Sequence, residues 1–346
     1  MVALAKGEAS STSNPKLWLA LQVEGRLTDP VSLTFQIFDR TTEEKQIAPV
    51  SIEGPTAVDL NTDRLGLGRY VASYVAPTTT GLYRIRWTWQ LEAGGPSRTV
   101  DRDFEVLAGV VSSDPMYALV SDLRAEGVEG DSASDLRIQT ALLFASRMID
   151  RITGRFFSPR YSTYRFDGRH GRKLTMWDPI IALEELEIET ELIEPIGTLV
   201  SINDVRIYNR HLSQNMTNPD DRNSPKIEFV ELEGIPEARG LRFPSGVQNI
   251  KVTGLFGYTD FDGSPLGKTP DLIRHAAKLI TLREIPTLTE SGCRADARDG
   301  WRVTEERTRD QTVKYGSQAK WGQWIGDPEI DQILVMFMRP PDLGAT

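Results

Sequence analysis

Two hydrophobic periods alternate along this chain and divide it into segments. In residues 17–107 apolar side chains recur at every second position, most clearly in Tyr83, Ile85, Trp87 and Trp89, which alternate with polar side chains. A period of two is typical of a β-strand with one buried face. Turn-forming residues separate roughly six such runs. We therefore expect a β-sandwich at residues 15–108 and a flexible tail at residues 1–14, which are mostly small or polar.

A helical period begins after the boundary at residues 108–115. One apolar stripe recurs at alternating spacings of four and three, formed by Ile138, Leu142, Ala145, Ile149 and Ile152. This spacing follows one face of a helix, and Gly154 is a suitable stop. With shorter patterns elsewhere, and with Thr269 as an N-cap, it predicts helices at about residues 116–126, 134–153, 270–284 and 328–338.

Residues of about 160–258, between the second and third predicted helices, are again β-prone and rich in turn residues. The sequence therefore predicts an α+β multidomain protein. An N-terminal β-sandwich precedes a small α-helical core at residues 116–346, which holds a β-rich insertion and ends in a C-terminal helix.

The sandwich segment resembles immunoglobulin-like or fibronectin-type domains. The strings GRYVA (residues 68–72) and GLYRIRW (residues 81–87) carry this resemblance, although the cysteine pair of antibody domains is absent. The aromatic stripe of the second string has two interpretations. It either forms the core of the sandwich or offers a surface on which sugars stack. We favour the core, because alternation is what a half-buried strand requires in any case.

Net charge, cysteine content and the length of apolar runs limit the functions that the chain could have. The net charge is −9, whereas a protein that grips nucleic acid by neutralising phosphates is expected to carry a basic surplus. An acidic wall could still surround DNA and let it slide. The single cysteine, Cys293, excludes an internal disulfide framework. No apolar run reaches the roughly 18–20 residues that span a bilayer, and we expect a soluble protein made in a cytoplasm.

Residues that could carry chemistry are sparse. His170 lies in a predicted turn and His211 in a polar loop, while His275 has Asp271 four residues before it, a pair more typical of a helix-surface contact than of a metal site. Neither a phosphate-binding glycine loop nor a nucleophile elbow occurs. We therefore expect no enzymatic activity, no cofactor and no metal.

Three segments are candidates for interactions with other molecules. An acidic run could form a negative band along a channel or simply a solvated strand face; it contains Glu184, Glu185, Glu187, Glu189 and Glu191. A densely charged arm could fix the register between subunits or be merely solvated; its core is Glu305, Glu306, Arg307, Arg309 and Asp310. The last predicted helix could dock on its own domain or on another protein through Ile330, Ile333, Leu334, Phe337 and Met338.

Residues 116–339 resemble the head-to-tail connector, or adaptor, proteins of tailed bacteriophages and gene transfer agents. Four passages carry the resemblance in this order. They are DLRIQTALLFASRMID (residues 135–150) running into TGRFF (153–157), VTGLFGY (252–258) before TPDLI (269–273), VTEERTRDQTVKYG (303–316), and GDPEIDQIL (326–334).

This resemblance implies a structural protein of the virion neck, made in the host cytoplasm. It implies a homo-oligomeric ring, dodecameric in the family, between the portal protein and a stopper or tail terminator. Packaged double-stranded DNA would pass through the ring with transient, non-specific contacts. Residues 17–107 and the length of the β-rich insertion depart from the minimal family pattern, and we expect the added sandwich to decorate the outside of the neck.

Two alternatives stay open at this point. The chain could be a virion-surface or carbohydrate-binding module led by the β-sandwich. It could instead be a stopper or tail-completion protein of the same neck.

Overall fold

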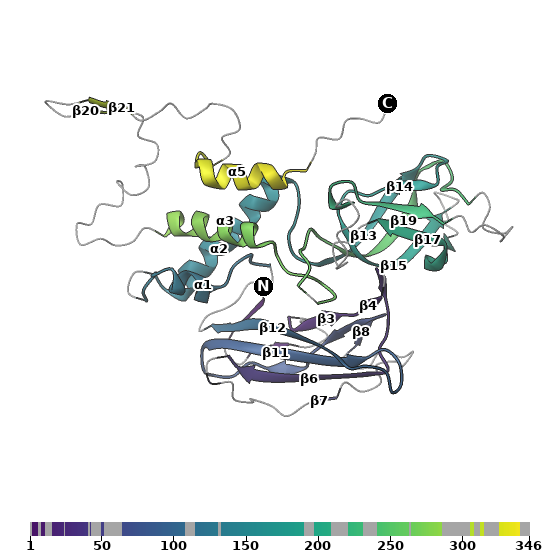
Figure 1. Ribbon diagram of the computed structural model, residues 1–346, viewed down its shortest axis with the longest axis horizontal. Helices are drawn as coiled ribbons and strands as arrows, with labels where there is room; N and C mark the ends of the chain where they lie inside the picture. Colours follow the sequence, from purple (N-terminus) through teal and green to yellow (C-terminus); the bar gives the residue numbers. More distant parts are fainter. Residues whose placement is uncertain are drawn as a thin grey trace.

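The computed structural model describes most of the chain and shows three parts, namely a β-sandwich, a group of helices and a second β-rich body (Figure 1). The described residues are 2–5, 8–10, 16–23, 25–40, 42, 50–51, 64–107, 115–130, 133–189, 197–208, 221–230, 241–262, 264–285, 305–307, 312–314 and 325–339. This arrangement confirms the predicted α+β fold class. Among the described residues, no helix is long and apolar enough to cross a membrane.

The sandwich has two layers. The larger sheet has the order β1-β12-β11-β6-β7, formed by β1 (Val2–Ala5), β12 (Arg98–Leu107), β11 (Gly81–Gln90), β6 (Ser32–Asp39) and β7 (Val50–Ser51). Opposite it lie the sheet β3-β9-β8 and the pair β10-β2, formed by β3 (Trp18–Ala20), β9 (Arg69–Val71), β8 (Arg64–Gly66), β10 (Tyr74–Val75) and β2 (Ala9–Ser10).

The aromatic stripe of β11 forms the core between these layers. Tyr83, Ile85, Trp87 and Trp89 are all buried, and the Trp87 ring packs on Phe35 of β6 with ring centroids 5.5 Å apart. Alternate side chains of a strand point to one face, so the stripe faces the opposite layer. The aromatic stripe is therefore not exposed, and a sugar could not stack on it.

The prediction of a flexible N-terminal tail is wrong for the described part of residues 1–14. Strand β1 pairs in parallel with β12, from Val2 beside Phe104 to Ala5 beside Leu107, and Leu4 is fully buried. Strand β2 pairs with β10. The physical reason is that the open edge of β12 offers unpaired backbone groups, which an apolar strand can satisfy while its leucine fills the core.

The helical core contains α1 (Val120–Ala125), α2 (Asp135–Thr153), α3 (Asp271–Glu284) and α5 (Pro328–Phe337). The predicted stripe of α2 is buried except for the partly exposed Ile152, and the helix ends at Gly154 in the left-handed conformation. Helix α5 begins at Pro328, where the Asp327 carboxylate accepts the backbone N–H of Glu329 at 2.7 Å. Helix α3 starts one residue later than expected, after Pro270, and Thr269 is not its cap.

The β-rich insertion lies between α2 and α3 and is itself two-layered. One sheet has the order β13-β19-β15-β5-β4, with β16 beside β15; it contains β13 (Arg160–Gly168), β19 (Gly246–Phe256), β15 (Ile180–Glu189), β5 (Arg26–Leu27), β4 (Gln22–Val23) and β16 (Gly197–Leu199). The other contains β14 (Lys173–Thr175), β18 (Lys226–Phe229) and β17 (Val205–Tyr208). Two short 3₁₀ turns, Ile202–Asp204 and Asp221–Asn223, accompany them.

The sandwich and the insertion share a sheet, which the sequence did not indicate. The β4–β5 hairpin comes from the N-terminal segment but pairs with β15, where Arg26 lies beside Leu183 and the Leu183 N–H donates to the Gly25 carbonyl at 2.7 Å. A small apolar cluster covers this junction, containing Ala20, Leu27, Ile181, Ala182, Leu255 and Leu266. The β4–β5 part of the N-terminal segment is therefore an integral part of the insertion's sheet.

A separate β-hairpin lies between α3 and α5 in the sequence. It consists of β20 (Glu305–Arg307) and β21 (Thr312–Lys314), and Glu305 lies opposite Lys314. In Figure 1 this hairpin stands clear of the sandwich, the helices and the insertion.

Candidate functional site

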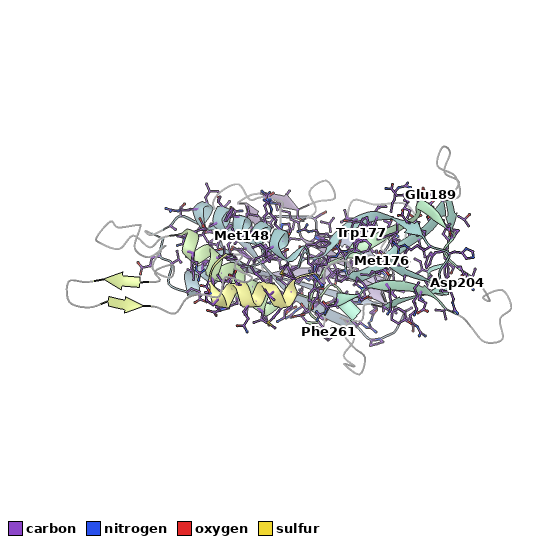
Figure 2. The ribbon with its side chains drawn as sticks, turned by 90° about the horizontal axis from the view of Figure 1, so that it is seen from above. Met148, Met176, Trp177, Glu189, Asp204 and Phe261 are labelled. Atoms are coloured by element: carbon purple, nitrogen blue, oxygen red, sulfur yellow. The ribbon has the colours of Figure 1, made fainter. Side chains whose placement is uncertain are left out.

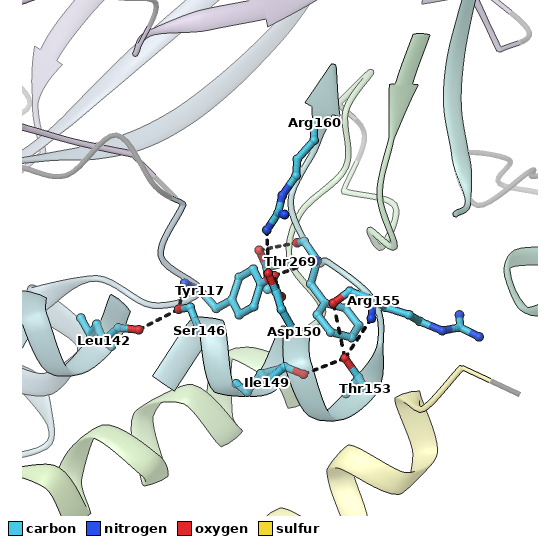
Figure 3. Close-up of polar contacts among 10 residues, drawn as sticks. Tyr117, Leu142, Ser146, Ile149, Asp150, Thr153, Arg155, Arg160 and Thr269 are labelled. Atoms are coloured by element: carbon cyan, nitrogen blue, oxygen red, sulfur yellow. Dashed lines mark hydrogen bonds and ion pairs between the residues drawn. The ribbon is translucent and has the colours of Figure 1, made fainter. Parts of the chain in front are cut away.

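The joint between the helical core and the insertion is a buried polar network (Figure 3). The Tyr117 hydroxyl accepts the backbone N–H of Phe157 at 2.9 Å and donates to the Asp150 carboxylate. Arg160, the first residue of β13, donates to the other oxygen of Asp150 at 2.6 Å. Because Asp150 lies near the end of α2, this network fixes the direction in which the chain leaves the helix and enters the insertion.

Burial sets the protonation behaviour of this network. It raises the pKa of Asp150, although the hydrogen bonds from Tyr117 and Arg160 act in the opposite direction. Burial, followed by the charge of Asp150, raises the pKa of Tyr117 well above its usual value. The hydroxyl therefore stays protonated and serves as a donor to the carboxylate throughout the physiological pH range.

Two further hydroxyls support the network from neighbouring elements. The Ser146 hydroxyl accepts the N–H of Tyr117 at 3.1 Å and donates to the Leu142 carbonyl within α2. The Thr269 hydroxyl, which the sequence predicted as a helix cap, donates instead to the Phe157 carbonyl at 2.9 Å. Both polar groups of the Phe157 peptide region are thus satisfied from other parts of the chain.

A second joint links the sandwich to the helical core. The carboxylate of Glu105, on β12, accepts the N–H groups of Val120 at 2.9 Å and Ser121 at 2.8 Å. These are unpaired donors of the first turn of α1, where a negative charge is favoured. Glu105 is only 5% exposed, and this burial raises its pKa. On the same strand, Arg102 donates to the Ser264 hydroxyl at 3.2 Å.

An aromatic cluster lies where α5 meets the chain segments that enter and leave the insertion. The rings of Phe157, Tyr258 and Phe337 contact each other edge to face, with centroids 5.6 to 5.8 Å apart. The guanidinium groups of Arg155 and Arg222 lie 5.0 and 4.3 Å from the centre of the Tyr258 ring. The end of α5 is thus held in place by aromatic side chains from the two segments that enter and leave the insertion.

The apolar side of α5 faces its own domain. Ile330, Ile333 and Leu334 are buried in a cluster with residues of α2 and α3, and Phe337 and Met338 are half-buried. The sequence left open whether this face docks on its own domain or on another protein. In the structure it packs on its own domain. The outward side of the same helix carries Val335 and Met336, which are 52% and 65% exposed.

The acidic run lies on β15 beside basic residues of neighbouring strands. Glu187 lies opposite Lys251 of β19, with Oε2 and Nζ 2.8 Å apart, and Glu189 accepts from Arg165 of β13 at 2.9 Å. Glu184 lies 3.5 Å from Arg69 of the sandwich, Glu185 is half-buried, and Glu191 lies outside the described residues. Figure 2 shows Glu189 at the end of the insertion that is remote from the helices. These pairings weaken the field that an acidic band would project, and the band stays a prediction.

The charged arm corresponds to the β20–β21 hairpin. The backbone of Glu305, Glu306 and Arg307 forms β20, while Arg309 and Asp310 lie outside the described residues. Within the part of the chain that the structure describes, no group of three or more His, Cys, Asp or Glu side chains is placed to hold a metal ion.

Sequence reasoning missed Tyr117, Asp150 and Glu105. One signal was present in the printed sequence: Ser146 and Asp150 follow the inward stripe of α2 one turn apart, on a largely apolar side of the helix. Polar side chains on such a face need partners from elsewhere in the fold. The identity of those partners depends on tertiary contacts that no local pattern specifies.

Comparisons with known proteins give little beyond this geometry. No protein-family model matches the chain, and no curated protein matches it. Among solved structures, the chain is similar to one from the neck of an empty gene transfer agent (GTA) particle, computed with C6 symmetry. The TM-score is 0.35 and the identity 18%, over 52% of this chain and 84% of that one. A similarity of this size carries no argument about fold or role.

Proposed function

We propose that this chain is a structural protein of the neck of a tailed phage or phage-like particle, namely a head-to-tail adaptor without enzymatic activity. The observation that carries the proposal is where the four adaptor-like passages lie in the fold. The first and last form α2 and α5, and the second ends in the first turn of α3. These three helices pack on one another in one apolar cluster, while the third passage forms the β20–β21 hairpin.

The arrangement of the helices and of the segments between them supports a role as one subunit of an assembly. Between consecutive helices of this small core, the chain makes two excursions, the β-rich insertion after α2 and the hairpin after α3. A small core that projects extended elements gains further stability when neighbours cover them, and like subunits that repeat one such contact close into a ring.

The proposed ring contains several copies, twelve by analogy with the family, and surrounds the DNA path. One face contacts the portal protein and the other contacts a stopper or tail terminator. The surplus of 49 acidic over 40 basic side chains suits a wall that DNA passes without strong binding. The protein would be part of the virion after synthesis in the host cytoplasm.

The carbohydrate-binding alternative has lost its main support, because the aromatic stripe on which it depended is buried. A stopper or tail-completion role differs from the adaptor role only in the layer of the neck that the chain occupies. Cryo-electron microscopy of intact particles carrying a tag on this chain distinguishes them. We expect density for the tag in the layer that touches the portal. Density one layer further from the capsid would support the stopper role, and density outside the neck would contradict both.

A further inference from the structure

Strand β13 is an open sheet edge. It is nine residues long, and its ladder runs to β19 on one side, from Arg160 beside Phe256 to Phe166 beside Ile250. In the described part of the chain, no other hydrogen bond between two backbone groups involves residues 160–167. It is also the longest edge strand among the described sheets. A long unpaired edge is a template for another strand, and proteins usually cover or interrupt it.

An exposed tryptophan lies beside this edge. Trp177 is 50% exposed and packs on two side chains of β13, with its ring centre 5.7 Å from that of Tyr164 and 4.9 Å from that of Phe166. The Tyr164 hydroxyl donates to Asp178 at 2.9 Å, which holds the segment carrying Trp177 against the strand. Strand-addition sites combine a free edge with an apolar contact for a side chain of the incoming strand, and tryptophan is common in such contacts.

The same chain also contains a hairpin that needs a partner. Strands β20 and β21 pair only with each other in the described structure, so each has one free edge. An isolated two-stranded hairpin is at best marginally stable in water and requires further packing. Figures 1 and 2, seen from directions 90° apart, both place this hairpin on the far side of the helices from the insertion. In one chain the hairpin therefore lies away from the β13 edge.

We propose that the β20–β21 hairpin of one copy adds to the β13 edge of a second copy, beside Trp177. This inference rests on the proposed ring and names the contact that builds it. The hairpin and the edge are different surfaces, so each subunit donates one strand and accepts another. Such a head-to-tail contact closes into a ring when the rotation between subunits permits it.

Cross-linking between two differently sized versions of the protein tests the contact. In a Cys293→Ser background, a tagged version carries Thr163→Cys on the exposed face of β13, and an untagged version carries Val313→Cys on β21. Directly opposite residues on neighbouring strands have Cβ atoms about 5 Å apart, so a short bismaleimide tolerates small differences in register. After assembly with the portal protein, we expect a covalent pair of mixed size. As a control, Thr140→Cys, exposed on α2, replaces Thr163→Cys and should give no such pair.

The outcomes separate this inference from the proposed function. Rings that form with the portal but give no mixed pair above the Thr140 control would overturn strand addition and leave the adaptor role standing. Failure to form rings at all would contradict the adaptor role and the inference together. A double variant with both cysteines on one chain should not cross-link within the monomer; efficient internal cross-linking would show that the hairpin covers its own β13 and would overturn the inference.

A second variant probes the apolar part of the contact. Trp177→Ala should lower the yield of rings at least severalfold at a fixed protein concentration, while Leu199→Ala, at a 66% exposed position on β16, should not. Circular dichroism checks that both variants stay folded. A folded Trp177→Ala protein that assembles as well as the Leu199→Ala control would count against the site beside β13.

Discussion

The Tyr117 hydroxyl is hydrogen-bonded to the Asp150 carboxylate at the point where α2 gives way to the insertion. Both side chains are largely shielded from water, and the same hydroxyl accepts the N–H of Phe157. One phenolic oxygen therefore holds together a loop before α1, the end of α2 and the entry to β13. The orientation of the insertion relative to the helices depends on this contact.

Tyr117→Phe should destabilise the protein clearly, because it leaves the Phe157 N–H and one side of Asp150 without their partner. Buried polar groups left unsatisfied cost about 1–3 kcal/mol each. Urea unfolding followed by circular dichroism measures the change. The matched control is Tyr164→Phe, which removes a hydroxyl bonded to Asp178 at a half-buried site and should cost less. Equal losses in the two variants would contradict the larger cost expected at the buried network.

Glu105 should make the protein less stable as the pH rises, which is opposite to the effect of a surface carboxylate. Its folded pKa is raised above the ordinary value of 4.5, so the folded state holds the proton more tightly than the unfolded state. The contribution of this group to stability is therefore full below pH 4.5 and is lost as the pH rises through the folded pKa.

The measurement compares the wild type with Glu105→Gln by urea unfolding at a series of pH values from about 4 upwards. The variant should be less stable throughout, because its amide can accept only one of the two α1 N–H groups. The excess stability of the wild type over the variant should shrink as the pH rises across this window. A difference that stays constant or grows would mean that Glu105 is not the titrating group.

The two sides of α5 should respond differently to truncation. Leu334→Ala removes a fully buried side chain and should cost about 2–5 kcal/mol, whereas Met336→Ala removes a 65% exposed one and should leave unfolding nearly unchanged. Chemical denaturation compares them. If the helix instead docked on a partner through its apolar side, Leu334→Ala would weaken partner binding without loss of stability in the isolated protein.

The junction between the N-terminal segment and the insertion can be tested at a glycine. Gly25 has a φ of 81°, and an added Cβ would lie 3.2 Å from Ile207 Cδ1 of the insertion. Gly94 has a similar φ of 74° but no atom within 4 Å of an added Cβ. Gly25→Ala should therefore destabilise more than Gly94→Ala, by about 1 kcal/mol or more, because only the first adds crowding to the backbone strain. Indistinguishable unfolding midpoints would contradict the tight junction.

Sequence patterns predicted those elements that depend on residues close together in the chain. The stripe of α2, its stop at Gly154 and the Asp327-Pro328 start of α5 all depend on residues within a turn or two of one another. The alternation in β11 likewise indicated a buried face without naming what covers it. These patterns were sufficient for the fold class.

Contacts between distant segments were out of reach of the same reasoning. Leu4 lies in a strand because the edge of β12 is available for pairing. The Thr269 hydroxyl does not cap α3 and donates to the Phe157 carbonyl. The pairing of Leu183 with the β4–β5 hairpin joins residues more than 150 positions apart. The acidic run looked like a continuous charge in the sequence, yet Lys251 and Arg165 come to it from separate strands.

The mass of the native protein, measured by size-exclusion chromatography with light scattering, tests the central claim most directly. The chain should elute alone largely as a 38.7 kDa monomer and form, on addition of the portal protein, a complex that contains many copies of it. A chain that remains a compact monomer, with the same mass and the same stability whether or not the portal protein is present, would contradict the account.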